Sequence, residues 1–144
     1  MTHTRILVIR LGALGDVVLS CGPFQAIRRH HKGSHITLLT TQPYVDFLKN
    51  SDWFDEIIID HRPSFWQVRK WIRLSKFLRA GNFDRIYDLQ TSDRSGWYYK
   101  LLGPGKGPEW SGIVRGCSHP RPFPPDLYHP REIHQRHLAN VQHL

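Results

Sequence analysis

Short apolar runs alternate with helix-type segments along the first 117 residues, and this alternation constrains the fold more than any other feature of the chain. Apolar runs of strand length cover residues 6–9, 36–41, 56–60 and 85–90, with a fifth near Ile113. Helical patterns separate them at residues 16–31, 43–50, 64–80 and 92–103. Short strands that are apolar throughout are typical of a parallel sheet covered on both faces. Right-handed crossovers then predict a doubly wound, Rossmann-like α/β domain.

Residues 118–144 differ in composition from the rest of the chain. They hold five of the ten prolines and five of the ten histidines. Pro125 and Pro130 exclude a regular helix across this stretch. His134 and His137 have no acidic or cysteine partner at ligand spacing, so no metal site is predicted. The sequence therefore predicts a domain over residues 1–117 and an irregular tail, without a regular strand, over residues 118–144.

The composition indicates a globular protein with an anionic partner. The net charge is +8 and 40% of the residues are hydrophobic. Nucleic acid, acidic lipid and phosphorylated sugar all fit this charge. No apolar run approaches the ~18 residues of a membrane span, and no signal peptide is recognisable, so a cytoplasmic protein is expected. Cys21 and Cys117 lack ligand spacing, which favours free thiols in a reducing compartment.

The first expected strand is followed by the glycine loop RLGALGD, residues 10–16. It is not the G-x-G-x-x-G fingerprint of dinucleotide-binding domains, because Ala13 and Leu14 occupy the middle, and no G-K-[ST] follows as in a phosphate-binding P-loop. Asp16 ends the loop at the carboxyl edge of the expected sheet, where open α/β sheets place their ligands. Two roles are open for Asp16: the N-cap of the next helix, or a carboxylate presented to a substrate hydroxyl.

Several segments together carry a resemblance to a known family. They read RILVIRLGALGDVVLSCGPFQAIRRHH, HITLLTT, FDEIIID and FDRIYDLQTSDRSGWYYKLLG, and they extend over about residues 4–117. The chain thereby resembles the N-terminal half of the family 9 glycosyltransferases, the heptosyltransferases that build the inner core of bacterial lipopolysaccharide. The most specific parts are GDVV with Pro23 in the following helix, and the segment with Asp88, Leu89, Gln90, Arg94 and Ser95.

The resemblance implies a GT-B fold, in which two Rossmann-like domains face a cleft without a metal ion. The N-terminal domain then binds a lipid A–Kdo acceptor. The other domain binds ADP-heptose, which is a substrate, so no cofactor is expected. By this match Asp16 is the general base, which deprotonates the acceptor hydroxyl for attack with inversion at the anomeric carbon. The acceptor-binding residues that the match implies are Leu14, Gly15, Gln90 and Arg94.

The long helix expected at residues 64–80 carries a basic stripe. Arg69, Arg73 and Lys76 follow i, i+4, i+7 spacing, Arg62 precedes the helix, and no acidic residue occurs between Asp60 and Asp84. The residues expected to face the core are Phe65, Val68, Ile72 and Leu78. These cations are therefore predicted to bind acceptor phosphates or an anionic surface at the inner face of the inner membrane; the alternative is a solvated helix face.

The family's donor domain has no counterpart in the 144 residues. A truncated chain, inactive alone and derived from a frameshifted gene, is therefore expected. Two further readings stay open: a basic nucleic-acid-binding module and a nucleotide-binding Rossmann-like domain. The sequence has no recognisable nucleic-acid-binding motif, so no nucleic-acid partner is expected. The nucleotide-binding alternative is disfavoured because the glycine loop does not match a nucleotide-binding fingerprint. The sequence does not specify an oligomeric state.

Overall fold

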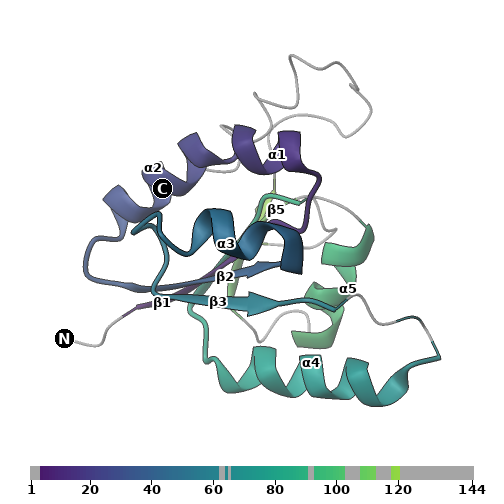
Figure 1. Ribbon diagram of the computed structural model, residues 1–144. Helices are drawn as coiled ribbons and strands as arrows, with labels where there is room; N and C mark the ends of the chain where they lie inside the picture. The colour runs from purple at the N-terminus through teal and green to yellow at the C-terminus, as the bar shows by residue number, and fades with distance from the viewer. Residues whose placement is uncertain are drawn as a thin grey trace.

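The computed structural model describes residues 4–61, 64, 66–90, 93–102, 108–112 and 118–120. Strands and helices alternate along the chain, as the sequence predicts (Figure 1). The strands are β1 (Arg5–Ile9), β2 (His35–Thr40), β3 (Glu56–Ile59), β4 (Arg85–Asp88), β5 (Glu109–Gly112) and β6 (His119–Pro120). The helices are α1 (Leu14–Leu19), α2 (Cys21–His30), η1 (Gln42–Tyr44), α3 (Val45–Leu48), α4 (Val68–Ala80) and α5 (Asp93–Leu102).

The six strands form one parallel sheet in the order β3-β2-β1-β4-β5-β6. The order reverses at β1, which pairs with β2 on one side and with β4 on the other. This is the doubly wound Rossmann arrangement, so the fold-class prediction is confirmed. In such sheets the ligand crevice lies outside the carboxyl ends of the strands at the reversal, here the ends of β1 and β4.

Two helical layers cover the two faces of the sheet (Figure 1). Alternate side chains of β1 point to opposite faces: Ile6 and Val8 pack with α1, α2 and α3, whereas Leu7 and Ile9 pack with α4 and α5. All four are fully buried. Because both faces are covered, the central strands read as continuous apolar runs, and this is why they can be recognised in the sequence.

Two expected elements have different bounds in the structure. The helix expected at residues 16–31 is divided into α1 and α2 at Ser20, whose buried hydroxyl donates to the Asp16 carbonyl at 2.8 Å. The fifth strand ends at Gly112 and so lies slightly before the predicted position; Ile113 falls outside the described residues. The expected long helix begins at Val68.

The side of α4 that faces the core was predicted correctly for Leu78 and wrongly for Val68 and Ile72. Val68 and Ile72 are 58% and 49% exposed, whereas Trp71 and Leu74 pack against the buried Leu78 in the core. Apolar residues occupy most sides of this helix, so its sequence alone fits more than one orientation. Phe65 lies outside the described residues.

The prediction that residues 118–144 form no strand is wrong for two residues. His119 and Pro120 form β6, which pairs with β5, and the Ser118 hydroxyl accepts a 2.7 Å hydrogen bond from the Trp110 amide. Proline is tolerated there because β6 is an edge strand. Residues 121–144 and Cys117 lie outside the described residues. Within the part of the chain that the structure describes, no helix is both long and apolar enough to cross a membrane.

Candidate functional site

The loop from Arg10 to Ala13 crosses the carboxyl edge of the sheet at the strand reversal. Gly12 adopts a φ of +148°, which strains any L side chain. A Cβ at Gly12 would also lie only 3.0 Å from a ring carbon and the hydroxyl oxygen of Tyr44 in η1. Glycine is therefore required here both by its backbone angle and by the close approach of Tyr44.

Arg10 is a buried cation that joins the loop to the neighbouring strand. Its side chain is 4% exposed, one guanidinium nitrogen lies 3.3 Å from the Asp16 carboxylate, and another donates to the Leu89 carbonyl at 2.5 Å. Leu89 directly follows β4, so the ion pair is anchored to the sheet. A carboxylate held in this way is oriented before any ligand binds.

Asp16 lies in the first turn of α1, at the carboxyl edge, with its side chain 36% exposed. The helix is preceded by Ala13 at the N-cap position, so Asp16 is not the N-cap residue. One of the two roles left open by the sequence is thereby removed. The remaining role, a carboxylate presented to a ligand, is compatible with this partial exposure and stays a prediction.

A second carboxylate, that of Asp88, acts electrostatically on Arg10. Asp88 ends β4 and is fully buried, and the absence of a side chain at Gly112 of β5 makes room for it: a Cβ there would lie 3.0 Å from the Asp88 Cβ. Burial lowers the pKa of the Arg10 guanidinium from its usual value, whereas the charges of Asp16 and Asp88 act in the raising direction. Arginine nevertheless remains protonated at any physiological pH, so Arg10 is a permanent cation that interacts electrostatically with both carboxylates.

Two further side chains fix the loop. The Gln90 carboxamide oxygen accepts a 2.9 Å hydrogen bond from the Leu11 amide, and the Thr41 hydroxyl donates to the Leu11 carbonyl at 2.6 Å. Thr41 follows β2 and Gln90 follows β4. Both strands next to β1 therefore contribute a polar side chain to the loop that carries Asp16.

The structure brings together only some of the predicted site residues. Leu14, which is 60% exposed, and the exposed Gly15 precede Asp16 in α1, and Gln90 contacts the same loop. Arg94 belongs to α5, which follows β4, but its side chain is not described. Arg62 lies outside the described residues.

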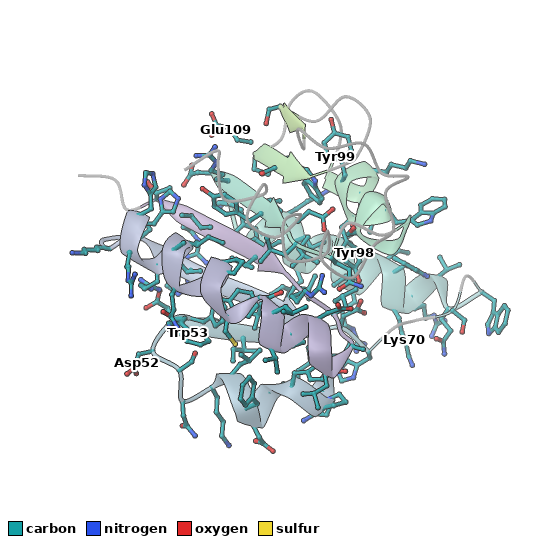
Figure 2. The ribbon with its side chains drawn as sticks, turned by 90° about the horizontal axis from the view of Figure 1, so that it is seen from above. Asp52, Trp53, Lys70, Tyr98, Tyr99 and Glu109 are labelled. Carbon is teal, nitrogen blue, oxygen red and sulfur yellow. The ribbon has the colours of Figure 1, made fainter. Side chains whose placement is uncertain are left out.

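The basic stripe of α4 lies in the other helical layer, away from Asp16. At 100° per residue, Arg69, Arg73 and Lys76 fall within about 60° of one another on the helix. Their centre is about 170° from that of the core-facing side chains. All three are exposed, and Figure 2 shows their neighbour Lys70 at the outer edge of the molecule, whereas Tyr98 of α5 lies near its centre.

Sequence reasoning missed Arg10, whose side chain contacts both the Asp16 carboxylate and the Leu89 carbonyl. One signal could have identified it: a charged residue directly after a buried strand, six positions before an aspartate. It also missed the buried Asp60 after β3, whose carboxylate accepts a hydrogen bond from the Tyr98 hydroxyl. Among the described residues no three His, Cys, Asp or Glu side chains gather as they would around a metal ion. Cys21 is a half-buried free thiol.

These features define a class: a Rossmann-like α/β domain of the kind found in GT-B glycosyltransferases, with a fixed carboxylate at the strand reversal. Several solved structures resemble it, among them the following three. A glycosyl transferase family 9 protein from Veillonella parvula has a TM-score of 0.75 at 19% identity, covering 96% of this chain and 41% of that chain. Escherichia coli heptosyltransferase WaaC, solved with ADP-2-deoxy-2-fluoro heptose, has a TM-score of 0.71 at 12% identity, covering 97% and 48%.

Escherichia coli ADP-heptose lps heptosyltransferase II has a TM-score of 0.62 at 21% identity, covering 76% of this chain and 30% of that chain. No protein-family model and no curated protein sequence matches. At these sequence identities the similarity shows the fold alone. The resemblance to heptosyltransferases noted in the sequence is therefore confirmed for the fold. The chain spans less than half the length of each of these three structures.

Proposed function

We propose that this chain is the acceptor-binding half of a glycosyltransferase of the heptosyltransferase type, with Asp16 as the general base. The observation that carries this proposal is the Asp16 carboxylate itself. It is partly exposed at the carboxyl edge of β1 and lies 3.3 Å from the buried guanidinium of Arg10. A base must be both accessible to its substrate and held in one orientation, and few surface carboxylates meet both conditions.

In the proposed reaction, an acceptor hydroxyl lies within hydrogen-bond distance of an Asp16 carboxylate oxygen. Asp16 takes the proton as the hydroxyl oxygen bonds to the anomeric carbon of the donor sugar. The bond from that carbon to the nucleoside diphosphate breaks on the opposite face, which inverts the configuration. Arg10 keeps the carboxylate in place, and the Gln90 amide group, next to the same loop, is a hydrogen-bond donor for the acceptor.

The substrates proposed are ADP-heptose as donor and a lipid A–Kdo glycolipid as acceptor. The names of two structural neighbours, an ADP-heptose lps heptosyltransferase and WaaC solved with an ADP-heptose analogue, support this choice. The proposal includes metal-independent transfer and a cytoplasmic location at the inner face of the inner membrane. Leu14 and Gly15, both exposed beside Asp16, are proposed to contact the acceptor.

Because the chain spans 41% of the family 9 structure, transfer is proposed only together with a donor-binding domain. The 144-residue chain alone is expected to yield no heptosylated product from ADP-heptose and Kdo-lipid A, since a donor sugar must be positioned by contacts in addition to those of the acceptor-side residues proposed here. Product formed at a few turnovers per second, an ordinary enzymatic rate, would contradict this division of roles.

Binding of the acceptor to the isolated chain tests the proposal directly. A soluble Kdo-containing oligosaccharide should shift the NMR signals of residues 11–18 and 89–90, and should leave those of α2 unchanged. In a longer relative that carries this loop, replacing the aspartate equivalent to Asp16 by Asn should lower turnover by about 100-fold with acceptor affinity retained. Shifts confined to other segments, or unchanged turnover, would refute the role of Asp16.

A further inference from the structure

An open hollow lies between α4 and α5, on the layer opposite Asp16. Its volume is about 490 Å³, in the range of small-molecule sites. We call it the α4–α5 groove; its lining is Val68, Trp71, Ile72, Ser75, Lys76, Arg79, Trp97 and Leu101. Val68, Ile72 and Trp97 are 58%, 49% and 44% exposed. Apolar side chains gathered at a surface are a usual feature of interaction sites.

Positive charge borders this apolar surface. Lys76 and Arg79 line the groove, and Arg79 is fixed by two hydrogen bonds to the Leu101 carbonyl, at 2.8 and 3.1 Å. The ammonium group of Lys100 lies 4.7 Å from the Trp97 ring centre. No acidic residue occurs between Asp60 and Asp84, so α4 carries no carboxylate of its own. The surface therefore combines apolar contact with positive charge that its own helix does not offset.

A ligand that fits must supply both an apolar chain and a negative group. An anionic phospholipid does: an acyl chain can lie against Val68, Ile72 and Leu101 while its phosphate meets Lys76 and Arg79. A nucleic-acid backbone would satisfy the cations but would leave the aliphatic side chains of the groove without apolar contact. Trp97 at the rim and the 82% exposed Trp66 before α4 are residues of the type that membrane interfaces favour.

We propose that the α4–α5 groove docks this protein on a membrane surface that contains anionic phospholipid, with one acyl chain in the groove. In this orientation Lys76, the residue of the stripe that lines the groove, meets the headgroups, and Arg69 and Arg73 lie next to it on the outer side of α4. Asp16 then lies in the helical layer that faces away from the bilayer, at the carboxyl edge of the sheet. This docking requires neither a sugar acceptor nor Asp16, so it stands or fails separately from the proposed reaction.

Sedimentation of the 144-residue chain with vesicles tests the charge part of the proposal. Binding should be strong with phosphatidylcholine vesicles containing about one third phosphatidylglycerol, weak with phosphatidylcholine alone, and reduced by salt. R73Q/K76Q should bind about 30-fold less, because each basic residue near such a surface contributes a factor of about five. The matched control R29Q/K32Q removes the same charge from the other layer and should change binding less than about 3-fold.

A pair of exposed valines tests the groove itself. Val68 in the groove and Val18 on α1 are 58% and 52% exposed, so both V68N and V18N should fold. V68N should weaken vesicle binding, and V18N should not. Phospholipids with brominated acyl chains should quench the tryptophan fluorescence, and W97F should reduce that quenching.

Three results would overturn the docking proposal. They are equal binding to neutral and anionic vesicles, equal losses in each variant and its control, and tryptophan fluorescence that brominated chains do not quench. Tighter binding to duplex DNA than to anionic vesicles at the same ionic strength would also overturn it, in favour of a nucleic-acid surface.

Discussion

The two helical layers of this protein expose apolar side chains to a similar extent but in different electrostatic surroundings. On the first layer, Leu14, Val18 and Phe47 are at least half exposed near the acidic Asp16 and Asp46. On the second, Val68 and Ile72 lie on a helix with cations and no acids. Beside the first layer, Arg10, Gln90 and Thr41 form the polar network that holds the loop and its carboxylate, Asp16. The second layer instead offers a broad surface of cationic and apolar side chains. The two proposals thus place recognition of an acceptor hydroxyl and adhesion to a membrane surface on opposite faces of one sheet.

Removing Arg10 should have the largest effect on stability. R10M removes the buried guanidinium that pairs with Asp16 and donates to the Leu89 carbonyl, and breaking such buried polar contacts typically costs about 3 kcal/mol. The exposed Arg29 provides the control, since R29M should change the free energy of unfolding by less than about 0.5 kcal/mol. Urea denaturation of both variants measures the difference. Equal free energies of unfolding for R10M and R29M would show that the contacts of Arg10 do not stabilise the fold.

Truncating the side of α4 that faces the core should have the next largest effect. Leu78 is 1% exposed, so L78A should lower the free energy of unfolding by about 3 kcal/mol. Ile72 is 49% exposed, and I72A should cost less than about 1 kcal/mol. Thermal or urea unfolding distinguishes them. A larger loss for I72A than for L78A would reverse the orientation of α4 and place the groove in the core.

The two glycines of the loop should respond in opposite directions. G12A places a Cβ 3.0 Å from the Tyr44 ring at a φ of +148°, and should destabilise the protein by about 2 kcal/mol. Gly15 has open space around it and lies within α1, so G15A should be neutral or stabilise by up to about 1 kcal/mol. Chemical denaturation compares them. Similar losses in both would mean that Gly15 has a packing role.

A smaller effect, dependent on pH, is expected at His31, where the first layer meets β4. Burial, followed by the positive charges of His30, Arg85 and Arg28, lowers the pKa of His31 from 6.5 to about 4. Between these values the unfolded chain binds more protons than the folded one, so the free energy of unfolding should fall as pH decreases from about 6.5 to about 4. H31Q cannot titrate and should show a shallower slope in denaturation curves over that range. An unchanged slope would assign the acid sensitivity to other groups.

The sheet could be predicted from the sequence because its strands are buried on both faces, so that runs such as ILVI are apolar throughout. The position of Asp16 at the carboxyl edge followed from the same pattern. The orientation of α4 could not be predicted, because Val68, Trp71, Ile72 and Leu78 together cover more than one side of the helix. The break at Ser20 depends on one side-chain hydrogen bond to a carbonyl, which no residue pattern reveals.

The contacts of Arg10 could not be predicted for a different reason. Its partner carbonyl, at Leu89, is 79 residues further along the chain, and only the assembled sheet brings the two together. The two-residue strand β6 is likewise formed by pairing with β5, against the local preference of its proline. Local sequence patterns therefore predicted the strands, the helices and the sheet edge on which Asp16 lies. The contacts that hold Asp16 depend instead on the pairing of β1 with the distant strand β4.

The placement of β1 between β2 and β4 also determines the order in which the molecule can assemble. During synthesis, β1, α1, α2 and β2 leave the ribosome first and can pair at once, because His35 is only 30 positions after Arg5. Arg10 then stays exposed until β4 emerges and docks, and closing that longer loop carries the larger entropic cost. We expect hydrogen exchange during refolding to protect the β1–β2 amides before those of Leu89 and Gln90, which donate to the Ile9 carbonyl. The carboxylate at the loop would then be among the last parts of the domain to become ordered, and a nascent chain would have no formed site until most of the domain had been synthesised.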